Sequence, residues 1–209
     1  MSNDNHFEAR QQSILAAAAE AFDAHGYAAT TIDEVARQAG ISKGSVYNYF
    51  HSKQELFTQL FAQSLAPTEA DVDRMLEDLS DPAGMIERLI DYWYGELDYH
   101  KRTGRLMLEF RVSAAREEQD GDLTRLLREM HRRWIDRIGR ILRRGIERGV
   151  FRADLDLERV AWGLIGQFDG LLMNMILDVG MEVDEAMIAS LKQWILTALG
   201  FDRAERNAS

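Results

Sequence analysis

The sequence predicts an all-α fold of about nine helices, in which an N-terminal three-helix helix-turn-helix unit precedes a C-terminal helical bundle. Apolar residues recur at helical spacing through most of the chain, and no stretch alternates apolar and polar residues as a half-buried strand does. Capping residues and glycines delimit these stretches. The two prolines, Pro67 and Pro82, fall at expected helix edges, where proline is tolerated.

The first helix is predicted from an apolar stripe that ends at Gly26. The second begins after Thr31, whose hydroxyl can cap it, with Glu34 three residues later completing a capping box. Gly40 then supplies the left-handed residue with which many helices end. The stripe of the first helix consists of Ile14, Leu15, Ala18, Ala21 and Phe22.

Ser42 is expected to cap a third helix over residues 43–49, and Ser52 with Glu55 forms the capping box of a fourth helix that stops at Pro67. Two short helices joined by a glycine turn form the helix-turn-helix pattern, whose second helix enters the DNA major groove. The sequence therefore predicts a DNA-binding domain over residues 1–66.

The remaining residues, 67–209, are predicted to form a second, helical domain. Residues 68–81 are acidic and weakly patterned, which favours a loop containing a short helical piece. Five helices follow, over residues 82–103 with Gly104 closing the first of them, 105–116, 123–148, 156–179 and 184–199.

The distribution of charge indicates which part of the chain can face DNA. The net charge is −10, and residues 1–65 hold four Lys and Arg against seven Asp and Glu, a net of −3. Residues 35–54, however, contain no carboxylate but do contain Arg37, Lys43, His51 and Lys53. We expect a locally positive face on an acidic protein, which suits a site-specific regulator better than a packaging protein.

Other protein classes are disfavoured. There is no cysteine, no apolar run of membrane-spanning length and no signal-peptide pattern, so we expect a cytoplasmic protein without membrane contact. Zincin, phosphate-loop and nucleophile-elbow motifs are absent, and the five histidines lack metal-ligand spacing. An enzyme, a metal site and a cofactor are therefore not expected.

The helix-turn-helix region resembles the TetR (tetracycline repressor-like) family of transcriptional regulators. The matching segments are Gly26-Tyr27, residues 30–36, residues 39–47, Tyr49-Phe50 and residues 53–56. The resemblance implies phosphate contacts from Thr31, Tyr49 and Lys53, and groove contacts from Lys43, Ser45 and Tyr47. With their neighbours, the predicted DNA-binding residues are Thr30, Thr31, Ser42, Lys43, Gly44, Ser45, Tyr47, Asn48, Tyr49 and Lys53.

Three of these residues have structural alternatives. Thr31 can serve only as a helix cap. Lys53 can be a solvated lysine near a helix start, where a positive charge is slightly unfavourable. Tyr49 can be a packed core residue whose hydroxyl reaches water.

The resemblance also implies a two-fold homodimer through the last two helices, which would read a palindromic double-stranded operator. Both helices are apolar on more than one face, and Gly163, Gly166 and Gly170 are costly inside a helix unless another helix packs closely. Burial within the monomer is the alternative.

A small-molecule effector is expected in the second domain, although plain core packing explains the same residues. Aromatic and methionine side chains from four predicted helices could line one cavity, which suits a largely apolar ligand. The candidate ligand-binding residues are Trp93, Leu97, Met107, Phe110, Trp134, Phe168 and Met173. Nine arginines between residues 125 and 148 indicate a solvated, ion-paired helix rather than a second nucleic-acid site.

We therefore predict a ligand-responsive transcriptional regulator, a repressor released from its operator by the effector. An activator remains compatible with the sequence. The alternative function is a DNA-bound regulator controlled by a protein partner, without a small-molecule ligand.

Overall fold

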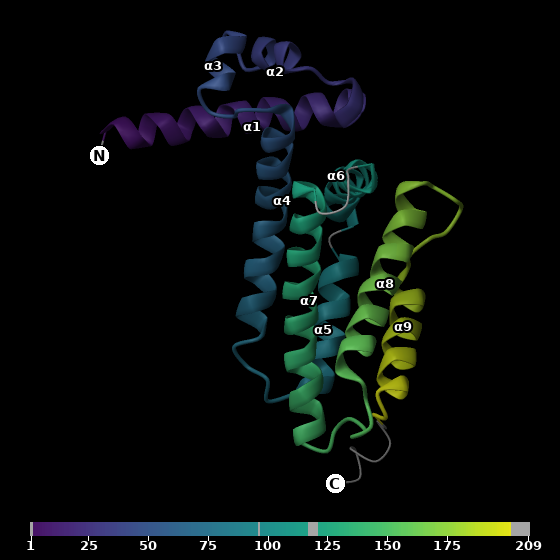
Figure 1. Cartoon of the computed structure of the whole chain (residues 1–209). Helices are drawn as coiled ribbons and strands as arrows, with labels where there is room; N and C mark the ends of the chain where they lie inside the picture. The colour runs from purple at the N-terminus through teal and green to yellow at the C-terminus, as the bar shows by residue number, and fades with distance from the viewer. Residues whose placement is uncertain (1, 96, 117–120, 202–209) are drawn as a thin grey trace. The chain divides into compact units, whose positions relative to one another are not determined.

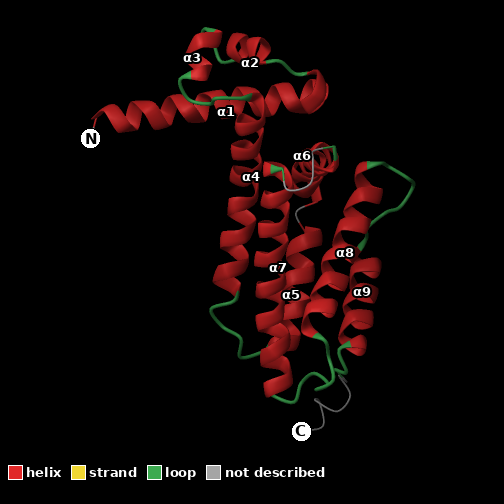
Figure 2. Ribbon diagram, in the orientation of Figure 1, coloured by secondary structure: helices red, strands yellow, loops and turns green. Residues whose placement is uncertain are grey.

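The computed structural model describes residues 2–95, 97–116 and 121–201, with the backbone alone described at 2–5 and 97–103. Within these residues all regular structure is helical, which confirms the predicted all-α class (Figure 2). The helices are α1 (Ser2–Ala29), α2 (Ile32–Gln38), α3 (Lys43–Tyr47), α4 (Lys53–Met75), α5 (Pro82–Gly95), α6 (Leu97–Ala115), α7 (Asp122–Glu147), α8 (Leu157–Ile176) and α9 (Glu185–Ala198). None of the described helices is both long and apolar enough to cross a membrane.

The chain forms two compact units. The first comprises Met1–Pro67 and Arg105–Leu123, and the second comprises Thr68–Gly104 and Thr124–Ser209. The first unit thus holds the helix-turn-helix together with the second half of α6, a segment that the sequence pattern assigned to the later domain.

The first unit is built on an aromatic core. Phe61 stacks on Phe110 of α6 with 4.0 Å between ring centroids, and Phe57 lies 5.5 Å from the same ring. All three side chains are fully buried. Because stacked aromatic rings bury large areas and favour defined geometries, this cluster fixes α6 against the start of α4.

The second unit has its own hydrophobic core, to which α5, α7, α8, α9 and the end of α4 contribute (Figure 1). Its most buried members include Met85 and Ile86 of α5, Ile138 and Ile141 of α7, and Ala161 of α8. These positions recur at helical spacing, so the apolar stripes read from the sequence become the inner faces of the helices.

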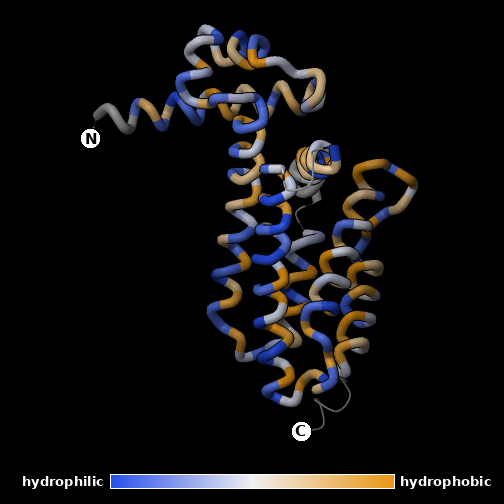
Figure 3. Tube along the Cα trace, viewed as in Figure 1, coloured by the Kyte–Doolittle hydropathy of each residue, from blue (hydrophilic) through white to orange (hydrophobic). Residues whose placement is uncertain are grey.

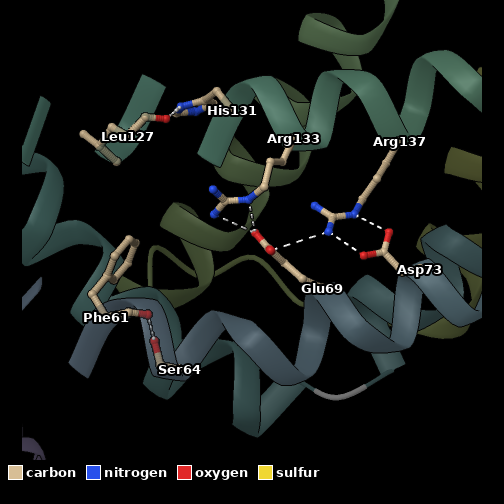
Figure 4. Close-up of polar contacts among 8 residues, drawn as sticks. All are labelled: Phe61, Ser64, Glu69, Asp73, Leu127, His131, Arg133 and Arg137. Atoms are coloured by element: carbon tan, nitrogen blue, oxygen red, sulfur yellow. Dashed lines mark hydrogen bonds and ion pairs between the residues drawn. The ribbon is translucent and has the colours of Figure 1, made fainter. Parts of the chain in front are cut away.

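The prediction that Pro67 ends its helix is wrong, because α4 runs through Pro67 to Met75. Proline removes one backbone donor from the helix, so tertiary contacts must favour continuation. Val72 and Leu76 enter the second core. Glu69 and Asp73, one helical turn apart, pair with Arg133 and Arg137, also four residues apart on α7 (Figure 4).

The predicted helix end at Gly104 is also wrong. Helix α6 begins at Leu97 and continues through Gly104 to Ala115. A Cβ at Gly104 would lie 2.7 Å from Cδ1 of Ile176 and 3.1 Å from Cδ2 of Leu172, both on α8. The glycine therefore permits a close helix–helix approach instead of ending a helix.

Candidate nucleic-acid interface

Side-chain hydroxyls cap the N-termini of both helices of the helix-turn-helix. Thr31 caps α2, where its Oγ1 accepts the backbone N–H of Glu34 at 3.3 Å. Ser42 caps α3, where its Oγ accepts the backbone N–H of Ser45 at 3.1 Å. Between the two helices, Gly40 adopts the left-handed conformation with φ of 67°. These local bonds fix the two helices in register, as the sequence pattern predicts.

Helix α3 presents a mostly exposed outer surface. Val46 is fully buried and anchors the helix to the core, whereas Lys43, Gly44, Tyr47 and Asn48 are exposed. Ser45 is half-buried, and its hydroxyl lies 2.8 Å from that of Ser42. A short helix with a buried apolar side and an exposed, small-residue polar side can approach a groove closely.

Lys43, at the start of α3, is already paired. Its Nζ lies 2.7 Å from Oδ2 of Asp33 in α2, and both side chains are at least half exposed. The hydrogen bond to this carboxylate raises the pKa of Lys43 above its ordinary value. Residues 35–54 contain no carboxylate, yet in the folded chain the carboxylate of Asp33 lies beside Lys43, the first residue of α3. Sequence spacing alone missed this contact.

Lys53 supports the end of α1. Its Nζ donates to the carbonyl oxygens of Tyr27, Ala28 and Thr30 at 2.8, 3.3 and 3.0 Å, and it lies 4.5 Å from the centroid of the Tyr27 ring. Partial burial lowers the pKa of Lys53. A cation on the last carbonyls of a helix satisfies acceptors that have no partner within the helix. This role differs from both sequence readings of Lys53.

Thr30 and Tyr49 are held by the protein itself. The side chain of Thr30 is buried, and its Oγ1 donates to the carbonyl oxygens of Gly26 and Ala21 at 2.8 and 3.1 Å. Tyr49 is half-buried, and its ring packs 4.6 Å from that of Phe7. Thr30 therefore lies inside the fold. The exposed candidates are Thr31, Ser42, Lys43, Gly44, Tyr47 and Asn48.

Glu109 of α6 is a contact that the sequence pattern did not indicate. Its Oε2 accepts the backbone N–H of Tyr27 at 3.2 Å, next to Gly26, where the backbone of α1 turns with φ of 77°. Together with Lys53, this carboxylate holds the residues that lead from α1 into α2. No local sequence signal could reveal a contact between residues 82 positions apart.

The candidate ligand-binding residues do not all lie in one unit of the structure. Trp93, Trp134 and Phe168 meet in the second unit, where the Trp93 ring lies 5.9 Å from that of Trp134 and 5.0 Å from that of Phe168. Met173 is half-buried on α8.

The other candidates lie elsewhere. Met107 and Phe110 belong to the first unit, where Phe110 fills the aromatic core. The side chain of Leu97 lies outside the described residues. Beside the three-ring cluster, burial raises the pKa of Tyr94 to about 12.

Comparison with known proteins agrees with both parts of the chain. Residues 14–60 match the family model described as bacterial regulatory proteins of the tetR family, and residues 82–200 match that of the C-terminal part of BetI-type transcriptional repressors. The uncharacterized HTH-type transcriptional regulator YfiR of Bacillus subtilis is 28% identical over 198 residues, which cover 94% of this chain and 95% of YfiR.

Solved structures show the same fold. A TetR transcription regulator from Haloarcula marismortui superposes with a TM-score of 0.75 at 23% identity, covering 92% of this chain and 97% of that one. The regulator FadR from Bacillus subtilis, solved in complex with stearoyl-CoA, gives 0.71 at 21% identity, covering 90% and 96%. Since the second family model spans more than half of the chain, the chain belongs to the TetR family of transcriptional regulators and is a DNA-binding regulator, not an enzyme.

Proposed function

We propose that the protein is a homodimeric repressor that reads a palindromic operator through α3 and releases it when a small, largely apolar ligand binds in the second unit. The observation that supports DNA readout best is the exposed row of Lys43, Gly44, Tyr47 and Asn48 on α3, anchored by the buried Val46. Lys43 and Tyr47 offer donors to base edges and phosphates.

Thr31 is proposed as a phosphate contact besides its capping role. It stands exposed just before α2, and its hydroxyl can donate to a phosphate oxygen while it accepts the backbone N–H of Glu34. We propose that Tyr49 and Lys53 contribute mainly by positioning, because the ring of Tyr49 and the ammonium of Lys53 are already engaged within the fold.

The exposed apolar surface of α8 and α9 supports the proposed dimer. Trp194 is 62% exposed, and Leu177 and Val179 in the connection between these helices are similarly open, a segment that Figure 3 shows as strongly hydrophobic. A Cβ at Gly166 or Gly170 would meet no atom within 4 Å, so neither glycine is required by packing inside the chain. Exposed large apolar residues of this kind suit an interface with a second copy.

The ligand proposal rests on the cluster of Trp93, Trp134 and Phe168, which come from α5, α7 and α8. Its rings are apolar, as the walls of small-molecule sites usually are, and a solved structural neighbour is a complex with stearoyl-CoA. A ligand that binds one arrangement of these helices more tightly than another would shift DNA affinity by differential binding to the two states.

Selection of bound sequences from random DNA, followed by release assays with fatty acids and their CoA esters, tests this function. We expect an enriched palindrome and release that is weakened by Phe168→Ala, with Val112→Ala, at an exposed apolar residue of the first unit, as the control. An enriched sequence without two-fold symmetry would contradict the dimeric readout. A palindrome that no ligand releases would contradict ligand control.

A further inference from the structure

The arginines of α7 fall into two groups with different surroundings. Those facing α4 are paired: Arg133 bonds Glu69 at 3.1 Å, and Arg137 bonds Asp73 at 2.7 Å (Figure 4). For this group the expected ion pairing holds. The side chain of Arg137 is buried, so these contacts serve the fold of the second unit.

The second group lines a half-open groove of about 840 Å³ between α7 and the beginning of α8. This volume lies within the range of roughly 300–1,000 Å³ typical of small-molecule sites. The groove is lined by Thr124, Leu127, Arg128, His131, Arg132, Ile135, Asp136, Gly139, Arg140, Arg143, Leu157, Glu158 and Trp162. Among the residues that the structure describes, Arg132 and Arg143 make no hydrogen bond or ion pair.

Gly139 lies between these two arginines on the same face of α7, seven residues after Arg132 and four before Arg143. A Cβ at Gly139 would meet nothing within 4 Å. Glycine weakens a helix interior relative to alanine, and here no close packing requires it. Its effect is to leave the groove open between two guanidinium groups.

An aromatic wall completes the groove. Trp162 of α8 is 45% exposed, and its ring stacks on that of His131, with centroids 5.1 Å apart and planes 30° apart. The orientation of His131 is fixed by a bond of 2.8 Å between its Nδ1 and the carbonyl oxygen of Leu127 (Figure 4). The groove therefore offers an ordered, exposed indole close to Arg132.

Charge selects the kind of ligand. Four arginines against Asp136 and Glu158 give the groove a net positive charge of two, within a chain of net charge −10. Guanidinium groups bind phosphate oxygens in a bidentate manner, and an indole face accepts a planar ring. Arg132 and Arg143 lie eleven positions apart on the α-helix, a rise of about 16 Å, which suits an elongated ligand.

We propose that this groove binds a small phosphorylated ligand that carries a planar ring, with a nucleoside diphosphate as the simplest member of the class. The planar ring of the ligand stacks on the indole of Trp162. The phosphates of the ligand lie over Gly139, within reach of Arg132 and Arg143. This site is separate from the Trp93–Trp134–Phe168 cluster and does not depend on the proposed repressor function.

Isothermal titration of the full chain with ADP, in the absence of DNA, tests the proposal. We expect ADP to bind more tightly than either adenosine, which lacks the phosphates, or pyrophosphate, which lacks the ring, and to bind more weakly as salt is raised. Arg132→Gln and Arg143→Gln should each weaken ADP binding by about tenfold. The control Arg144→Gln removes the same charge from α7 outside the groove and should leave binding unchanged.

Gly139→Leu provides a test that leaves the arginines in place. The new side chain fills the groove, so ADP binding should be lost while helicity and melting temperature are retained. Absence of ADP binding to the wild-type chain at millimolar concentration would overturn the proposal, as would equal weakening by Arg144→Gln. A wild-type dimer that Gly139→Leu converts to monomers would show that a second copy occupies the groove, and would overturn it too.

Discussion

At the scale of single residues, the ion pair with Asp33 should limit how readily Lys43, a proposed DNA contact, reaches DNA. Asp33→Asn removes the carboxylate that lies 2.7 Å from the Lys43 ammonium, so Lys43 becomes free to reach a phosphate or base edge. We expect non-specific duplex affinity to rise several-fold and its salt dependence to steepen by about one phosphate contact. Fluorescence anisotropy over a salt series measures both. Asp23→Asn, the same charge change at an exposed position of α1, is the control; an equal rise there would mean that only net charge matters.

Lys53 is the second residue whose surroundings give a sharp expectation. Lys53→Met keeps much of the aliphatic side chain but leaves the carbonyl oxygens of Tyr27, Ala28 and Thr30 without their shared donor. We expect the free energy of unfolding to fall by about 1–3 kcal/mol, because partly buried acceptors lose a charged partner. Urea unfolding measures this free energy. Arg37→Met, at an exposed side chain, should change it little. If Lys53→Met unfolds with the free energy of the wild type, Lys53 does not stabilise the end of α1.

At the scale of elements, α7 contains two glycines with opposite surroundings. A Cβ at Gly145 would lie 1.9 Å from the ring of the buried Phe151, whereas one at Gly139 would meet nothing within 4 Å. Gly145→Ala should therefore destabilise the chain by about 1–3 kcal/mol through overpacking. Gly139→Ala should stabilise it by up to about 1 kcal/mol through helix propensity. Thermal unfolding of the two variants provides a matched comparison, and shifts of the same sign would contradict the packing described for α7.

The contact between α4 and α7 should respond to acid. Arg137 donates two hydrogen bonds to Asp73, at 2.8 and 2.7 Å, and they hold the pKa of Asp73 below its ordinary value. A carboxylate with a lowered folded-state pKa stabilises the fold above its unfolded-state pKa and loses that contribution as pH falls through the folded-state value. Stability should thus decline between about pH 5 and pH 2, by at most about 1 kcal/mol from this half-exposed group. Urea unfolding of Arg137→Met should show a smaller decline; an identical pH profile would contradict the role of the pair.

The bounds of α4 and α6 differ from those that the sequence pattern predicts, because local patterns do not report contacts with distant residues. Caps located the starts of α2 and α3, because Thr31 and Ser42 act on residues within their own first turn. Apolar stripes located α8 and α9 closely. The sequence pattern predicts helix ends at Pro67 and Gly104, whereas both helices continue there and contact distant residues on α7 and α8. Local propensity is a weak prior that such packing overrides.

The candidate site shows the same division. The exposed face of α3 follows from helical periodicity, since burial of Val46 determines which residues point outward. The partners of Lys43 and Lys53, and the position of Phe110 in the first unit, depend on chain segments that meet only in the folded protein. A stripe of apolar residues reveals that a side chain is buried, but not which neighbours bury it.

At the scale of the whole molecule, DNA affinity should depend on association of two chains. A dimer carries two recognition helices, which bind two half-sites. Once one helix is bound, binding of the second is intramolecular, and this raises the overall affinity. Trp194, 62% exposed on α9, is the most exposed of the large apolar side chains of α8 and α9. Trp194→Glu places a charge where the partner would bury it, at a cost of several kcal/mol.

Sedimentation should therefore find the wild-type chain at about twice its mass of 23.9 kDa and the Trp194→Glu variant near that mass. Operator affinity should fall by at least about 100-fold, because avidity between half-sites is lost. Val112→Glu, at an exposed apolar residue of α6, is the control and should leave both the mass and the affinity unchanged. If Trp194→Glu stays dimeric and binds the operator normally, the two chains must associate through a surface other than the exposed face of α9.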